Sequence, residues 1–322
     1  MKRIVLSAAL VAAVSLAPSA RAETLEFTAG QLGGGWYTMA TGMSKIIMQD
    51  YPELNIKVVP GGGTANPSKV NAGKSQLGMG LDVFTFLAYK GREIYTGKPH
   101  ENLMMIGMSF SDNYMHFLKA KDAKLGFEEL FAKAKNVDLA VTKAGSSDEQ
   151  TFRWVMKHYG TGYDDLRDNR DFKINQGNYA EMSSQYKDRQ VDYVFFNLGI
   201  PGAAAIDMLL SREGELMDFP DELLGALNDQ YGFLSSKIPA GTYKGQSADV
   251  TTIKMGTTLT VNADVSTDTV YKILKSICSN QDKLGAIHNS MKVFDCKTAG
   301  KDAPSPLHPG AVKYYKEMGY AM

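Results

Sequence analysis

The segment TLEFTAGQLGGGWY, residues 24–37, decides the fold class of this chain. An apolar strand over residues 24–29 leads into the triple glycine 33–35, and a helix with one apolar face follows over residues 36–49. Glycines at a strand exit let backbone N–H groups approach a ligand, and the N-terminus of the next helix attracts an anion. A second turn of this kind, GGGTAN, follows at residues 61–66. The two turns together predict a site for a small molecule.

Strands and helices alternate along the rest of the sequence. Further strands are predicted at residues 55–59, 77–81, 137–141 and 191–196, and each leads into a turn or a helix start. This alternation predicts an α/β architecture, in which ligands bind outside the carboxyl ends of the strands. Polar residues at those ends are Asp82, Ser146, Ser147 and Asn197.

Two helix starts are marked by their capping residues. Ser146 is followed three residues later by Glu149, which is the pattern of a capping box. Asn66 precedes Pro67, which predicts a helix with the asparagine as cap and the proline at the first helical position.

The N-terminus has the pattern of an export signal. Lys2 and Arg3 precede an apolar stretch over residues 4–16, and Ala20-Arg21-Ala22 is a cleavage site of the A-x-A type. The apolar stretch is too short to span a bilayer. We therefore expect residues 1–22 to be a signal peptide and the remaining chain to be periplasmic. Its length predicts one large or two medium domains.

Composition and motifs disfavour several classes of protein. Lys and Arg together number 35, as do Asp and Glu, so the neutral balance argues against a nucleic-acid partner. The five histidines lie in unrelated contexts, and neither H-E-x-x-H nor G-x-S-x-G occurs. The 17 methionines are scattered singly, which is typical of core filling. We expect no catalytic site, no cofactor and no metal.

The sequence has two cysteines, Cys278 and Cys296. In an oxidising compartment they can form a disulfide, which would stabilise the fold by roughly 3 kcal/mol in the chain-entropy model. The alternative is two separate buried thiols.

Five stretches carry a resemblance to a known family. They are residues 33–37, residues 60–66, residues 192–201, IPAGTYKGQ at 238–246 and LHPGAVKYYKE at 307–317. In this order they are similar to the TAXI-type solute receptors of TRAP transporters. The resemblance implies a two-lobed periplasmic binding protein of type II-like fold, with a central cleft between two mixed sheets. It places residues 23–115 and 255–322 in the first lobe and residues 116–254 in the second.

The resemblance also implies a function. A monomeric receptor would capture a small organic anion or an amino-acid-like solute by hinge closure, and would deliver it to the membrane permease subunits of a TRAP transporter. The alternative is a periplasmic sensor whose ligand regulates a membrane partner. The first glycine turn departs from the family, because Gly35 and Trp36 stand where members commonly carry Thr and Tyr. This change argues against transferring glutamate to this chain as its ligand.

The predicted solute contacts lie at the turns and strand exits. They are Gly33, Gly34, Gly35, Trp36, Tyr37, Gly62, Gly63, Thr64, Asn66, Asp82, Ser146, Ser147, Asn197, Pro201 and Tyr243.

Some of these residues also have a structural interpretation. Trp36 can be a core side chain, Asn66 and Asp82 can be helix caps, and Tyr243 can line the hinge. Acidic residues Asp148 and Glu149 already fill the helix start after Ser147. We therefore expect the carboxylate of the solute at the first lobe and its neutral part at the two serines.

Overall fold

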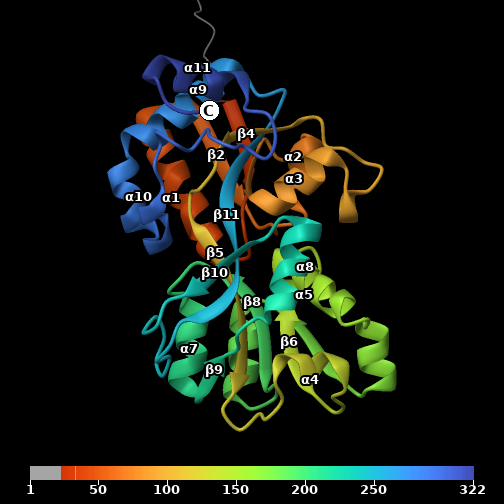
Figure 1. Cartoon of the computed structure of the whole chain (residues 1–322). Helices are drawn as coiled ribbons and strands as arrows, with labels where there is room; N and C mark the ends of the chain where they lie inside the picture. The colour runs from red at the N-terminus through yellow and green to blue at the C-terminus, as the bar shows by residue number, and fades with distance from the viewer. Residues whose placement is uncertain (1–22, 33) are drawn as a thin grey trace, which may run out of the picture.

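The structure, a computed structural model, describes residues 23–32 and 34–322, which form two α/β lobes (Figure 1). The predicted signal peptide, residues 1–22, and Gly33 lie outside the described residues. Within residues 23–32 and 34–322, no helix combines the length and the apolar character that crossing a bilayer requires.

The first lobe is built on a mixed sheet. Its strands are β1 (Glu23–Thr28), β2 (Leu54–Val59), β3 (Leu77–Leu81), β4 (Leu103–Gly107) and the second half of β11 (Val250–Asn262). β1 pairs in parallel with β2 and β3, whereas β11 runs antiparallel to β3 and β4. The helices are α1 (Gly35–Asp50), α2 (Asn66–Asn71), α3 (Asp82–Lys90), α9 (Thr267–Ser279), α10 (Gln281–Ile287) and α11 (Pro309–Met318), with 3-10 turns η1 (Glu93–Tyr95) and η3 (Asn289–Val293). In Figure 1, α1, α9 and α10 lie on one side of this sheet, and α2 and α3 on the other.

The second lobe is built on another mixed sheet, in the order β11-β5-β8-β6-β7. Its strands are β5 (Asp112–Ala120), β6 (Asp138–Thr142), β7 (Lys173–Gly177), β8 (Tyr193–Leu198), β9 (Gly214–Leu216) and β10 (Leu234–Ile238). Its helices are α4 (Phe127–Ala132), α5 (Ser147–His158), α6 (Tyr179–Lys187), α7 (Ala203–Ser211) and α8 (Asp221–Tyr231), with a π-helical turn η2 (Asp165–Asn169). β6 is parallel to β7 and β8, and β5 is antiparallel to β8.

One long strand joins the two sheets. β11 pairs with β5 and β10 as far as Gly256, and with β3 and β4 from Thr257 onward (Figure 1). At this crossing, Thr257 Oγ1 accepts hydrogen bonds from Trp36 Nε1–H (3.1 Å) and from the side-chain amide of Asn113 (2.6 Å). The Ser111 hydroxyl lies 2.8 Å from the same oxygen. The strand therefore holds residues of both lobes where it passes between them.

The apolar core of the second lobe continues into the first. Phe84 on α3 is fully buried and stacks on Trp154 of α5, with ring centroids 5.4 Å apart. Trp154 stacks in turn on Tyr231 of α8 at 4.1 Å. α3 thus packs into the aromatic core of the opposite lobe as well as against its own sheet.

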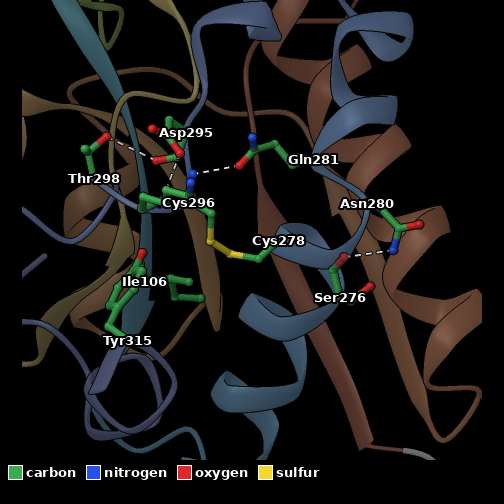
Figure 2. Close-up of a disulfide and its surroundings, with 10 residues drawn as sticks. Ile106, Ser276, Cys278, Asn280, Gln281, Asp295, Cys296, Thr298 and Tyr315 are labelled. Carbon is green, nitrogen blue, oxygen red and sulfur yellow. Dashed lines mark hydrogen bonds between the residues drawn. A yellow bond between two sulfur atoms is a disulfide. The ribbon is translucent and has the colours of Figure 1, made fainter. Parts of the chain in front are cut away.

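Cys278 and Cys296 form a disulfide (Figure 2). Cys278 lies at the end of α9, and the backbone N–H of Cys296 donates to Gln281 Oε1 at 2.7 Å. The bond closes a loop that contains α10 and η3. The loop packs on α1, where a Cβ built on Gly42 would lie 2.3 Å from Ile287 Cγ2.

Candidate functional site

A cavity of about 270 Å³ lies between the lobes and is lined from both. The first lobe contributes Gly30, Gln31, Gly34, Gly35, Trp36, Thr38, Met39, Gly61, Gly62, Gly63 and His288. The second contributes Ser146, Ser147, Asp148, Tyr179, Asn197, Leu198, Gly199, Gly202, Ala203 and Ala204. Asn113, at the start of β5, lines the cavity where the chain passes between the lobes. A volume of this order fits a small organic molecule.

Glycines let the two lobes approach one another around the cavity. A Cβ built on Gly62 would lie 2.5 Å from the carbonyl oxygen of Gly145 in the other lobe. One built on Gly63 would lie 2.9 Å from Ser147 Cβ, and one on Gly199 would lie 2.9 Å from Ser290 Cβ. A methyl group would be too close to the other lobe at each of these three glycines. The backbones of the two lobes are therefore in close contact around the cavity, and the lobes are closed on each other in this structure.

Two helices present uncapped N-termini to the cavity. α1 starts after Gly34 and α7 after Gly202, and neither has a side-chain cap or an acidic residue in its first turn. α5 differs, because Ser146 Oγ accepts from the backbone N–H of Glu149 and two acidic residues fill its first turn. An anionic group is therefore favoured at α1 and α7 rather than at α5.

Asn197 has a buried side-chain oxygen without a hydrogen-bond partner among residues 23–32 and 34–322. Its backbone N–H donates to Asp148 Oδ2 (2.9 Å), and its carbonyl accepts from the Tyr179 hydroxyl (3.0 Å). The residue is only 6% exposed, yet its Oδ1 has no hydrogen-bond partner among the described residues. Gln31 lines the same cavity from the first lobe, and its buried Oε1 also has no hydrogen-bond partner among the described residues. Since buried polar atoms are nearly always hydrogen-bonded, these oxygens are placed to accept from a ligand.

Asp148 organises the second-lobe wall of the cavity. Its carboxylate accepts from the backbone N–H of Asn197, from the Tyr179 hydroxyl (3.1 Å) and from the Ser147 hydroxyl (3.0 Å). Burial raises the pKa of Asp148 to about 6, and these hydrogen bonds oppose the shift.

The raised pKa of Asp148 predicts a pH dependence of stability. The folded protein holds this proton more tightly than the unfolded chain, whose Asp pKa is near 3.8. The protonated Asp148 therefore makes its full contribution to the free energy of unfolding below about pH 4. This contribution, on the order of 3 kcal/mol, is lost as the pH rises to about 6. Asp148→Asn should remove this fall, so urea unfolding of both proteins at pH 4, 5, 6 and 7 checks it. Parallel pH profiles of the two would contradict the assignment.

The cavity brings together many of the residues that the sequence analysis selected. Those that line it are Gly34, Gly35, Trp36, Gly62, Gly63, Ser146, Ser147 and Asn197. Gly33 lies outside the described residues. Trp36 combines both interpretations, because it lines the cavity, packs against the cores of both lobes and bonds to Thr257.

Asn66 does not line the cavity and is not the cap of α2, so its predicted cap role is wrong. The cap position is Ala65, and Asn66 is the first helical residue. Its side chain donates to the carbonyls of Ala29 (2.6 Å) and Met79 (2.9 Å) and accepts from the N–H of Gly62 (3.0 Å). Asn66 therefore joins the end of β1 and the middle of β3 to the second glycine turn and holds that turn in place.

Other predicted contacts also lie away from the cavity. Tyr37 packs against the first-lobe core, the carbonyl of Thr64 accepts from Tyr95, and Pro201 is exposed. Asp82 accepts from the N–H groups of Val83 and Gly256 and lines a separate groove between α3, α8 and residues 300–307.

Tyr243 reaches the cavity indirectly. Its hydroxyl accepts from the N–H of Gly202 (2.9 Å) and lies 2.8 Å from Nε2 of the buried His116. Burial lowers the pKa of His116 to about 4, so this ring is neutral at pH 7. Tyr243 thus positions the start of α7 without lining the cavity.

Several cavity residues were not selected from the sequence. The polar ones are Gln31, Thr38, Asn113, Asp148, Tyr179 and His288. Tyr179 follows the helix cap Asn178 at the exit of β7, which is the pattern that pointed to Ser146 and Ser147. No local pattern marks His288, which reaches the cavity only through the packing of the disulfide loop.

The fold is that of the two-lobed periplasmic binding proteins. The structure is similar to that of the periplasmic binding protein BugD, with a TM-score of 0.53, 12% sequence identity and coverage of 92% of this chain and 93% of BugD. It is also similar to XAC2383 from Xanthomonas citri in its ATP-bound structure, with a TM-score of 0.50, 9% identity and coverage of 92% and 95%.

The chain belongs to the NMT1-like family, which it matches over residues 27–319. This family match and the fold agree with the expectation that the chain is a substrate-binding protein and not an enzyme. The sequence-based prediction of a two-lobed α/β fold is confirmed.

Proposed function

We propose that this protein binds a small organic anion or an amino-acid-like solute in the cavity between its lobes. The observation that carries the proposal is the Asn197 amide, which is buried in the cavity wall while its oxygen lacks a partner in the described part of the chain. The uncapped N-termini of α1 and α7 favour the anionic part of the solute. The unpartnered oxygens suit a hydroxyl or ammonium group on the same molecule.

The proposed cycle is one of opening and closing. Lobes comprising residues 23–115 with 255–322 and residues 116–254 would separate about β5 and β11, admit the solute and close on it. The protein would act as a periplasmic monomer and deliver the solute to the permease subunits of a TRAP transporter. The sequence stretches shared with TAXI-type receptors support this choice of transporter.

A ligand screen followed by scattering tests the proposal. Thermal-shift measurements over carboxylates, amino acids and sulfonates should find a compound that raises the melting temperature. Small-angle scattering with that compound should then show a smaller radius of gyration than without it. A screen without any shift, or an unchanged radius with a bound compound, would count against the proposal.

Trp36 should report solute binding by fluorescence. The sequence has two tryptophans, of which Trp36 lines the cavity whereas Trp154 is 4% exposed and stacked between Phe84 and Tyr231. The emission change on adding the solute should persist in Trp154→Phe and disappear in Trp36→Phe. The reverse pattern would place the solute elsewhere.

A further inference from the structure

The loop closed by the disulfide carries a histidine into the wall of the cavity. His288 lies between α10 and η3, and it lines the cavity beside the first residue of α1. A Cβ built on Gly35 would lie 2.9 Å from His288 Nε2, so the lack of a side chain at Gly35 leaves room for the ring.

Hydrogen bonds on the other edge of the ring decide which nitrogen carries the proton. The backbone N–H of Ser290 donates to His288 Nδ1 (3.3 Å), and Ser290 Oγ lies 2.8 Å from the same nitrogen. Nδ1 is therefore an acceptor, and the neutral ring carries its proton on Nε2. Partial burial lowers the pKa of His288, which keeps the ring neutral at pH 7. The donor edge of the ring thus lies next to the start of α1.

We propose that His288 Nε2 donates a hydrogen bond to the anionic group of the solute, beside the uncapped N-terminus of α1. This inference deepens the proposed function and rests on it. An independent sign of a ligand is the Asn197 side chain in the wall of the same cavity, which is 6% exposed and whose oxygen no described residue contacts by a hydrogen bond. A side-chain donor next to a helix N-terminus is an arrangement that suits a carboxylate or a sulfonate.

The disulfide fixes His288 at this place. The neighbouring Ile287 packs on Gly42 of α1, and Ser290 lies against Gly199 of the second lobe. The loop therefore contacts both lobes, and its closure by the disulfide restricts the conformations that it can adopt. Opening the bond should weaken solute binding even though neither cysteine lines the cavity.

Calorimetric titration of four proteins tests the role of His288. Succinate, L-glutamate and methanesulfonate are titrated into the wild type, His288→Ala, His288→Gln and His158→Ala. For the probe that the wild type binds, His288→Ala should lose roughly tenfold or more in affinity, because a charge-assisted hydrogen bond is lost. His288→Gln retains an N–H donor and should lose only about threefold. His158 lies outside the cavity, so its variant should match the wild type.

The outcomes separate the two proposals. Equal affinities of the wild type and His288→Ala would overturn the role of His288 and leave the proposed function standing. A wild type that binds none of the probes would overturn the proposed function for these classes of anion, and this inference with it. The double variant Cys278→Ser/Cys296→Ser should keep its circular dichroism spectrum and lose roughly fivefold in affinity. Unchanged affinity would overturn the role of the disulfide.

Discussion

Gly62→Ala should weaken solute binding by roughly 100-fold or more, which corresponds to about 2.7 kcal/mol. The added methyl group would lie 2.5 Å from the Gly145 carbonyl oxygen, and both atoms are attached directly to backbone. Gly62 is not among the glycines with positive φ, so alanine is compatible with its local conformation. The clash therefore prevents closure without distorting either lobe. Calorimetric titration and small-angle scattering with solute measure the two consequences, lower affinity and an unreduced radius.

Gly225→Ala is the matched control for this variant. Gly225 lies in α8, and a Cβ built there meets no atom within 4 Å. The control should bind solute like the wild type and be slightly more stable, because alanine favours a helix over glycine. Gly62→Ala that binds as tightly as the control would show that closure is not needed for binding.

Asn197→Ala should lower solute affinity by roughly 30-fold, or about 2 kcal/mol, and leave the stability of the free protein unchanged or slightly higher. The reason is that no residue described in the structure makes a hydrogen bond to Asn197 Oδ1, whereas the solute is proposed to donate one. Most substitutions in a buried wall would lower affinity and stability together. Titration with solute and urea unfolding without it distinguish the two effects.

Asn66→Ala provides the opposite case. This asparagine is fully buried, and its side chain bonds to Gly62, Ala29 and Met79. Its loss leaves several buried backbone groups unpaired, so the free energy of unfolding should fall by about 2–4 kcal/mol. If Asn197→Ala were as destabilising as Asn66→Ala, the Asn197 side chain would have a structural role instead of a binding role.

Local sequence patterns predicted well where the strands end. They predicted less well which side chains at those ends line the cavity and which bond to the protein itself. The glycine turns and the cap Ser146 follow from backbone requirements that a short segment specifies by itself. Asn66 and Tyr243 have side chains suited to ligand contact, but each is bonded to backbone groups of the wall. A sequence does not show which partner a polar side chain finds once distant strands have paired.

The residues missed by the sequence analysis depend on long-range packing. His288 reaches Gly35 because the loop carrying it packs on α1 and is closed by a disulfide. Asn113 lies at the start of β5, where the chain passes between the lobes. Its side chain is oriented by a hydrogen bond to Thr257 of β11, which is 144 residues further along the chain. Such contacts leave no periodic pattern in the amino-acid sequence.

The stack of Phe84 on Trp154 limits how the molecule can open. The two rings come from opposite lobes and are 0% and 4% exposed, so pulling them apart would bring a large aromatic area into water. We therefore expect this pair to stay together and to lie close to the axis of rotation that passes through β5 and β11. The side of the molecule near α3 and α8 would then move little. The cavity would widen most near the glycine turns at residues 34–35 and 61–63.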